Sequence, residues 1–353
     1  MVGVSLLRSG SLQAEGGDSP GGRIPQDIRL GDRFETVARK VGPAVVAVEA
    51  AKPGKKGKSV DESGSGVMIR VQGHAGVYVL TNNHVISQAQ PSQITVTLHD
   101  NRILHPVQVW SDPESDIGLL RLEGGELLPT AQTGDSDLVR PGQWVLAFGS
   151  PFGLHQSVTH GIISARERGQ VSLGSTIRIK EFLQTDAAIN PGSSGGPLVN
   201  VEGEIIGLNT AIASHSGNNS GVAFSIPINL VKKVAANLLE KGVVARGYLG
   251  LQVAGSFETA DALKLGLERL QGALIESILP ETPAAKAGLR SGDVVLQIDA
   301  IVIRNENHFI NVVSGLEAGK QVRLRVWRDR VSKELPAVIG SWNEAQEKLK
   351  TEK

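Results

Sequence analysis

Three short segments of this sequence each place a side chain suited to acyl-transfer chemistry next to residues that permit tight turns. The segments are TNNHV, SDIGLL and NPGSSGGPLVN, and they contain His84, Asp116 and Ser194. A serine hydroxyl is a weak nucleophile until an imidazole accepts its proton, and the imidazole needs a carboxylate to fix its tautomer and to stabilise the cation formed. The three residues therefore predict nucleophilic acyl transfer through an acyl-enzyme, with Ser194 as the nucleophile.

The glycines around the serine predict an oxyanion hole. Gly192 lets the chain turn so that the backbone N–H groups of residues 192–194, which are Gly192, Ser193 and Ser194, converge on the developing oxyanion. Gly195 and Gly196 are expected to leave room for substrate. One such oxyanion contact contributes roughly 3 kcal/mol of transition-state stabilisation, so this segment is the strongest part of the interpretation.

Each of the three residues is a weak signal when taken alone. A single histidine among eight is more often structural or solvated, and two other aspartates, Asp100 and Asp112, lie near Asp116. Asp112 precedes a proline and is typical of a turn, whereas Asp116 opens an apolar stretch in which an acid needs a buried partner. We therefore expect Asp116 to be the carboxylate.

The order of the three residues along the chain distinguishes two hydrolase folds. The segment around Ser194 also satisfies the G-x-S-x-G pattern of lipases and esterases, in which the acid and the histidine follow the serine. Here the histidine and the aspartate precede Ser194 by 110 and 78 residues, and β-type sequence follows the serine. The order His, Asp, Ser is that of the chymotrypsin-like double β-barrel.

The elements that would position these residues are predicted to be mainly strands. Short apolar or alternating runs, separated by turn residues, lie between a helical segment near 34–41 and an amphipathic helix that Asn229 is expected to cap and Gly242 to end. About 180 residues are involved, which exceeds one small barrel and suits two. The predicted strands are 44–50, 66–70, 77–81, 94–98, 106–110, 117–122, 144–149, 177–183, 204–212 and 222–226, with PLVN directly after the serine segment.

The chain divides into four predicted parts. Residues 1–31 are rich in Gly, Ser, Gln and Asp and predict a flexible N-terminal segment, and residues 32–242 predict a trypsin-like serine protease domain. Residues 243–340 mix strands with two short helices, as in a small α+β domain. Residues 341–353 are charged and without an apolar face, which predicts a solvated tail.

Composition excludes several classes of protein. The 353 residues include Lys+Arg 36 and Asp+Glu 36, so the formal net charge of +0 gives no field that would attract nucleic acid. Cys 0 excludes disulfides and thiolate catalysis, and no group of histidines and carboxylates has metal-ligand spacing, so we expect neither a metal nor a cofactor. No apolar run is long enough to span a membrane, and the first residues match a signal peptide poorly.

The motifs resemble those of the HtrA (Deg) serine proteases. TNNHV, the acid in SDIGLL, TDAAINPGSSGGPLVN, and EIIGLNTAI followed by AFSIP occur in that family's order, and the resemblance runs from about residue 33 to residue 340. It implies a serine endopeptidase with two six-stranded β-barrels and an active site in the cleft between them. It also implies assembly as a homotrimer or a multiple of trimers, with contacts near Phe34.

The second domain resembles a PDZ domain. Tyr248, Leu249, Gly250 and Leu251 match the carboxylate-binding loop of that family, and ETPAAKAGLRSGDVVLQID matches its most recognisable internal stretch. Consecutive N–H groups of such a loop can hold a C-terminal carboxylate while the peptide adds as a strand beside the helix near Phe309. The resemblance therefore implies that C-terminal peptides bind here and regulate the protease.

The resemblance also implies a substrate class and a compartment. The base of the first substrate pocket is assigned to Ala188, Ile189, Thr210 and Ala211; because no charge lies there, cleavage after small or medium apolar residues is expected. Such residues become accessible mainly in unfolded chains, so misfolded proteins are the expected substrates and protein quality control is the expected role. Relatives work in the bacterial envelope and in organelles, which implies the periplasm or the cell envelope.

Position 193 departs from the family pattern. It is Ser where most relatives have Asn, and digestive proteases have Asp there to pair with a newly cut N-terminus. Without that acid, activation by propeptide cleavage is not expected. Ordering of loops is expected instead, at residues 189–193 with segments 167–176 and 212–221, and peptide binding at the PDZ groove would bias that order.

A binding protein is the competing hypothesis. In that case the PDZ domain and the barrel cleft would capture unfolded peptides with little turnover, as a chaperone or a sensor. The intact set of His84, Asp116 and Ser194 favours the enzyme, because a binding protein has no physical need for all three. Substitution of Ser194 by alanine separates the two hypotheses, since cleavage should vanish while peptide binding persists.

Overall fold

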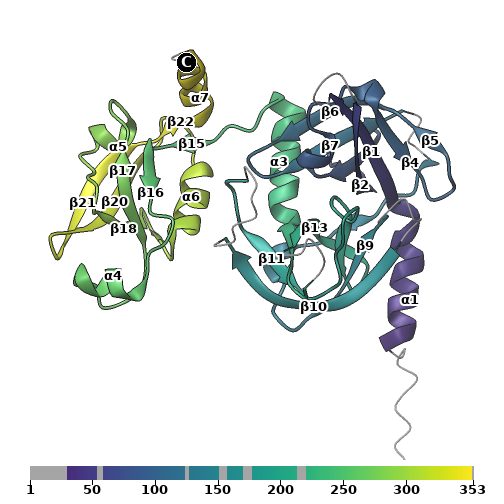
Figure 1. Cartoon of the computed structure of the whole chain (residues 1–353), viewed down its shortest axis with the longest axis horizontal. Helices are drawn as coiled ribbons and strands as arrows, with labels where there is room; N and C mark the ends of the chain where they lie inside the picture. The colour runs from purple at the N-terminus through teal and green to yellow at the C-terminus, as the bar shows by residue number, and fades with distance from the viewer. Residues whose placement is uncertain are drawn as a thin grey trace, which may run out of the picture.

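The computed structural model describes residues 30–53, 59–123, 127–150, 157–169, 177–212 and 220–351 (Figure 1). Apart from Leu30 and Gly31, the predicted flexible segment 1–31 lies outside these residues, as do most of segments 167–176 and 212–221. In the part of the chain that is described, no helix combines the length and the apolar character needed to cross a bilayer. The described part of the chain is mainly β: two seven-stranded sheets are followed by a smaller body with a six-stranded and a two-stranded sheet.

The first sheet carries the segments that contain His84 and Asp116. Its seven strands are ordered β5-β4-β1-β2-β3-β7-β6, with all neighbours antiparallel. The third strand is buried along its whole length, which explains its unbroken apolar run. The strands are β1 (Val45–Pro53), β2 (Ser59–Ile69), β3 (Val77–Thr81), β4 (Ile94–Thr97), β5 (Ile103–Leu104), β6 (Pro106–Asp112) and β7 (Ile117–Leu122).

The second sheet carries Ser194 and closes on itself. Its order is β12-β9-β10-β11-β14-β13-β8, and because β12 also pairs with β13, six strands form a closed ring. The remaining strand, β8, pairs in parallel with β13. Closure removes free sheet edges. The strands are β8 (Gln132–Thr133), β9 (Trp144–Gly149), β10 (Ser157–Arg168), β11 (Phe182–Thr185), β12 (Pro197–Asn200), β13 (Glu204–Ile212) and β14 (Ala223–Pro227).

Helices connect and cover the two sheets. After α1 (Leu30–Val41) and the one-turn α2 (Asn83–Ile86), α3 (Ile228–Lys241) packs against strands of both sheets and buries Val231, Val234 and Leu238. Gly242 ends α3 with φ +72, as predicted. The predicted N-cap was wrong: α3 begins at Ile228 after Pro227, and the side-chain amide of Asn229 donates to Asp135 at 2.7 Å.

The strands after α3 form a smaller body with its own core (Figure 1). Its main sheet is ordered β16-β17-β18-β20-β21, with β19 attached to β18, and β15 pairs separately with β22. The strands are β15 (Gly247–Tyr248), β16 (Leu251–Val253), β17 (Ala273–Ile278), β18 (Val294–Ile298), β19 (Ile301–Val302), β20 (Gln321–Arg328), β21 (Val331–Val338) and β22 (Gly340–Ser341). The helices are α4 (Thr259–Lys264), α5 (Pro283–Lys286) and α6 (Glu306–Ser314).

The C-terminal segment differs from the predicted solvated tail at 341–353. Residues from Trp342 to Thr351 form a helix, α7. The ring of Trp342 lies 5.6 Å from the ring of Tyr248 and beneath the guanidinium of Arg178, which is 3.9 Å from its centroid. The first residue of the helix, Trp342, therefore contacts both Tyr248 and Arg178.

A buried ion pair joins the chain after α3 to the first sheet. The guanidinium of Arg246 donates two hydrogen bonds to the carboxylate of Asp112, at 2.7 and 2.5 Å. The two side chains are 7% and 6% exposed. Such a bidentate pair is geometrically specific, and Asp112 therefore has a structural partner that is separate from His84.

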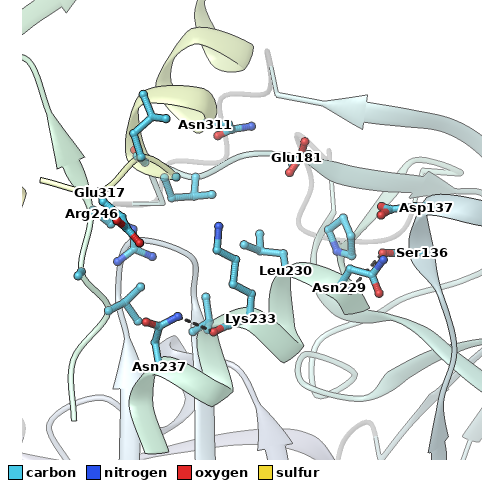
Figure 2. Close-up of a pocket in the computed structure, with 18 of the residues that line it drawn as sticks. Ser136, Asp137, Glu181, Asn229, Leu230, Lys233, Asn237, Arg246, Asn311 and Glu317 are labelled. Carbon is cyan, nitrogen blue, oxygen red and sulfur yellow. Dashed lines mark hydrogen bonds between the residues drawn. The ribbon is translucent and has the colours of Figure 1, made fainter. Parts of the chain in front are cut away.

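A cavity of about 700 Å³ lies between α3, the second barrel and the carboxyl end of α6 (Figure 2). Lys233 projects into it from α3, and Glu181 and Asn311 lie on the side opposite the helix, from the second barrel and from α6. Burial raises the pKa of the Glu181 carboxyl, and the nearby carboxylate of Glu167 raises it further. The two barrels with α3 and the smaller C-terminal body therefore meet at two places, the Arg246–Asp112 ion pair and this polar cavity.

Candidate active site

The imidazole of His84 is fixed at the start of the one-turn helix that follows β3. The backbone N–H of His84 donates to Oδ1 of Asp116 at 2.9 Å, and Nδ1 of its ring lies 2.8 Å from Oδ2 of the same carboxylate. The histidine side chain is 43% exposed, whereas that of Asp116 is 3% exposed. The ring therefore presents its other edge to solvent while a buried carboxylate orients it.

Asp116 sits in a strained turn directly before β7. Its φ is +57, which a non-glycine residue rarely adopts. Its backbone carbonyl accepts from the side-chain amide of Asn82 at 3.0 Å, and Thr210 donates its hydroxyl to Oδ2 at 2.7 Å. A buried carboxylate is stable only with several donors, and this one has donors from α2, through His84, and from β13, through Thr210.

The loop that carries Ser194 packs against β2 of the first sheet. Ser65 donates its N–H to the Ser194 carbonyl at 2.7 Å and its hydroxyl to the Gly192 carbonyl at 2.6 Å. The predicted purpose of Gly195 and Gly196 was wrong. A Cβ at Gly195 would lie 2.1 Å from the carbonyl oxygen of Ser65, and one at Gly196 equally close to that of Phe148. These glycines instead allow the backbone of Ser65 and of Phe148 to approach the serine loop closely.

The hydroxyl of Ser194 does not bond to the histidine in this arrangement. It donates to the backbone carbonyl of Thr210 at 3.4 Å, and within the described residues no hydrogen bond joins it to the His84 ring. The three side chains gather where the two sheets meet, and the serine proton is directed at the backbone of β13.

The amides around Ser194 fall into two groups. The Ser193 N–H donates to the carbonyl of Asn190 at 2.9 Å and so closes a turn. The Gly192 and Ser194 N–H groups donate to no acceptor among the described residues, and Gly192 has φ +92. Of the three amides predicted for an oxyanion hole, these two remain available to a bound oxyanion.

The four residues assigned to the substrate pocket are placed differently from one another. Ala188 is exposed and its carbonyl accepts from the hydroxyl of Thr159, whereas Ile189 is 2% exposed and belongs to the core. Thr210 bonds to Asp116 through its hydroxyl, and Ala211 pairs with Phe224 across β13 and β14. The assignment of a pocket to this set stays a prediction.

Sequence reasoning missed Ser65, which holds the serine loop in place. Its hydroxyl also accepts from the Ser150 N–H at 2.8 Å, so one side chain joins three segments. The available signal was the Gly64-Ser65-Gly66 sequence inside a strand. A Cβ at Gly64 would lie 3.0 Å from the Ser194 carbonyl oxygen, so the glycine permits a close approach of two backbones.

The predicted carboxylate-binding loop lies between β15 and β16. The Leu249 carbonyl accepts from Ala284 N at 2.8 Å and the Gly250 carbonyl from Leu279 N at 3.0 Å, while the N–H groups of Leu249 and Gly250 donate to nothing within the described residues. Gly250 has φ +78. The loop thus turns its carbonyls inward and leaves amides unused, as an anion site requires.

A small cavity of about 60 Å³ lies beside this loop. Apolar side chains of α6 line it together with the loop, and so do Glu114, Arg178 and Trp342. Burial raises the pKa of the Tyr248 hydroxyl, an effect that nearby Arg178 opposes. Among the described residues, no three His, Cys, Asp or Glu side chains are grouped so that they could hold a metal ion.

Two protein-family models match this chain. One describes a trypsin-like peptidase domain and covers residues 64–208, and the other describes a PDZ domain and covers residues 247–337. The first match contains the segments of His84, Asp116 and Ser194. The second contains the loop from Tyr248 to Leu251.

Curated relatives are proteases of bacteria. The "Probable periplasmic serine endoprotease DegP-like" of Halomonas elongata (strain ATCC 33173 / DSM 2581 / NBRC 15536 / NCIMB 2198 / 1H9) is 40% identical over 297 residues, which is 83% of this chain and 60% of that protein. A protein of the same name from Marinomonas sp. (strain MWYL1) is 44% identical over 267 residues, 75% of this chain and 54% of that one. The chain therefore spans only 54% to 60% of the length of these relatives.

Solved structures match over nearly their full length. The HtrA-type protease AlgW with a tripeptide has 38% sequence identity and a TM-score of 0.75, and the match covers 87% of this chain and 97% of that one. The serine endoprotease from Yersinia pestis has 31% identity and a TM-score of 0.63, with the same coverage of 87% and 97%.

Proposed function

The chain belongs to the family of HtrA-type serine proteases, and on this premise we propose that it is a serine endopeptidase of protein quality control that uses Ser194, His84 and Asp116. The observation that carries the proposal is the His84–Asp116 pair: a buried carboxylate, held by Thr210, contacts a half-exposed imidazole at 2.8 Å, next to the serine loop. A structural histidine does not need this arrangement.

The catalytic steps follow from these positions. The free ring nitrogen of His84 takes the proton of the Ser194 hydroxyl as its oxygen attacks the peptide carbonyl, and the same proton goes to the departing amine. Water then attacks the acyl-enzyme with His84 again as base, releasing the acid and restoring Ser194. Asp116 stays ionised and stabilises the imidazolium, and the Gly192 and Ser194 N–H groups bind the oxyanion.

The proposal is tested with the Ser194→Ala variant and a denatured casein substrate. Cleavage should fall by about a million-fold, to background, while the variant still binds a C-terminal peptide. Ser277→Ala is the matched control, because Ser277 lies in β17 and its hydroxyl donates to Gln252, far from the serine loop in the sequence. Cleavage by Ser194→Ala at the wild-type rate would show that the nucleophile is misassigned.

The substrates are proposed to be unfolded proteins cut after small or medium apolar residues. The first pocket is assigned to Ala188, Ile189, Thr210 and Ala211, and none of these carries a charge that would pair with a basic residue. Cleavage-site profiling on a peptide library tests this. A preference for Lys or Arg before the scissile bond would overturn the assignment.

The PDZ domain is proposed to bind C-terminal peptides and to regulate cleavage. The unused amides of Leu249 and Gly250 and the small cavity between this loop and α6 support this. The similar AlgW structures hold a tripeptide or a decapeptide. Cleavage rates are compared with and without a peptide that ends in an apolar residue; an unchanged rate and no binding would contradict the proposal.

A chaperone or sensor with little turnover is the second candidate. One observation favours it: the Ser194 hydroxyl bonds to the Thr210 carbonyl and not to His84. The same comparison separates the two functions, since a chaperone would protect denatured substrate equally in the wild type and in Ser194→Ala.

The chain is also proposed to form a trimer through the region of α1. The ring of Phe34 lies 5.6 Å from that of Trp144 and 5.3 Å from that of His160, and Trp144 and Leu30 are 41% and 43% exposed. Light scattering on a Trp144→Ser variant tests the contact, with Val331→Ser on β21 as the control. A variant that stays trimeric would place the contact elsewhere.

The unit boundaries and the compartment complete the proposal. A protease unit of 32–242 and a PDZ unit of 243–340 agree with the end of α3 at Lys241, and separately expressed units should each unfold cooperatively.

The curated relatives are named periplasmic proteases, which supports a location of this protein in the periplasm. Fractionation of cells that carry the full-length gene measures this directly.

A further inference from the structure

The backbone carbonyl of His84 is satisfied by a side chain from a distant strand. The helix α2 has only four residues and ends at Ile86, and Gln88 turns the chain away with φ +67. No backbone N–H donates to the His84 carbonyl within the described residues, although carbonyls at a helix end need a partner. The ammonium of Lys52, on β1, donates a hydrogen bond to it.

The position of Lys52 is itself restricted. Its side chain is 13% exposed, and its Nζ lies 3.5 Å from Oε2 of Glu62, whose side chain is 44% exposed. A lysine that is free in solvent keeps its rotamer freedom and loses conformational entropy when it is ordered. Here the Lys52 side chain is mostly buried, which restricts its rotamers and keeps its ammonium at the His84 carbonyl.

The segment that carries His84 is therefore held at both ends. Asp116 accepts from the His84 N–H at 2.9 Å and contacts its ring, and Lys52 holds the carbonyl on the other side of the same residue. We propose that Lys52 is a positioning residue that fixes the α2 turn and thereby keeps the His84 imidazole aligned with Asp116 and Ser194. This inference rests on the proposed protease function, and Lys52 touches neither substrate nor reacting atoms.

Substitution of Lys52 by methionine tests the proposal, because methionine keeps the apolar stem and removes the donor. In a steady-state assay with a fluorogenic peptide, kcat should fall by about tenfold to a hundredfold, the cost of a small misplacement of a catalytic group. The value of KM should stay near that of the wild type, since no substrate contact is lost. Lys52→Arg restores a donor and should recover most of kcat.

Two controls isolate the bond to the carbonyl. Glu62→Gln removes the ion pair but leaves the Lys52 donor, so its kcat should stay close to that of the wild type. Lys264→Met removes an exposed lysine of α4 and should change nothing. A normal kcat in Lys52→Met, or an equal loss in Glu62→Gln, would overturn the proposal, because the carbonyl bond would then not be the cause.

A second measurement does not depend on turnover. The proton on Nδ1 of His84, which faces Oδ2 of Asp116 at 2.8 Å, is expected to give a low-field NMR signal, and the His84→Asn variant assigns it. In Lys52→Met this signal should broaden while the unfolding temperature changes little, and an unchanged signal would contradict the proposal. The Ser194→Ala variant in the same assay keeps the two ideas apart: residual cleavage there contradicts the protease assignment, whereas a silent Lys52→Met contradicts only the positioning role.

Discussion

At the scale of single residues, Thr210 connects two members of the candidate triad through different atoms. Its hydroxyl donates to Asp116 at 2.7 Å, and its carbonyl accepts from the Ser194 hydroxyl at 3.4 Å. The sequence suggested only that this residue lines a pocket, because its contact with Asp116 depends on how the second barrel meets the first. His84, Asp116 and Ser194 could be picked out from the sequence, because few residue types can perform this chemistry. The hydrogen bonds of Thr210 could not be predicted in this way.

We predict that Thr210→Val lowers kcat by about tenfold to a hundredfold, because a hydrogen bond to a charged group contributes roughly 1.5 to 3 kcal/mol. Valine keeps the shape of the side chain and leaves the carbonyl in place. Thr210→Ser retains the hydroxyl and serves as the control, with activity near that of the wild type. Equal activity in the valine and serine variants would mean that Asp116 does not depend on this donor.

At the scale of elements, most strands were predicted and one long strand was missed. The predicted strands 77–81, 117–122, 144–149 and 204–212 have the observed bounds. The 12-residue β10 was not predicted, because SVTHGIISARER mixes polar residues with a glycine; a Cβ at Gly161 would lie 2.4 Å from the Ala187 N. Of the predicted strand 177–183, only the last two residues belong to a strand, because β11 begins at Phe182. Pairing with neighbouring strands, and not the local pattern, determines where a strand begins.

Arg246 lies in the linker that follows α3, and its ion pair with Asp112 should contribute to stability. Arg246→Met should lower the free energy of unfolding by about 3 kcal/mol, because it leaves the buried carboxylate of Asp112 without its main partner. Denaturant titration followed by tryptophan fluorescence measures the change. The double variant with Asp112→Asn should regain part of the loss, and a single variant as stable as the wild type would show that the pair contributes nothing.

At the scale of the whole molecule, the polar cavity between the two bodies makes stability depend on pH. Glu181 faces it, and its surroundings include the carboxylates of Glu167 and Asp137 and the guanidinium groups of Arg166 and Arg304. Burial, the largest effect, raises its pKa above the ordinary value of 4.5. The folded protein therefore favours the protonated form of Glu181. The free energy of unfolding that this preference contributes is fully present below pH 4.5, and it is lost as the pH rises through the raised pKa.

Glu181→Gln, which mimics the protonated carboxyl, should accordingly raise the unfolding temperature at neutral pH and leave it unchanged at about pH 4. Calorimetry across this range measures the difference. Glu317→Gln, on the rim of the same cavity, controls for the loss of one negative charge. A glutamine variant that is less stable than the wild type at neutral pH would contradict the assigned direction.

The long bond between Ser194 and the Thr210 carbonyl of β13 is only a weak restraint on the serine hydroxyl. A neutral hydrogen bond contributes about 1 kcal/mol, and a difference of that size corresponds to a population ratio of about five. Under the proposed protease function, turning the hydroxyl from this carbonyl toward the imidazole therefore costs no more than one weak hydrogen bond. A single well-made contact of a bound substrate is enough to offset that cost.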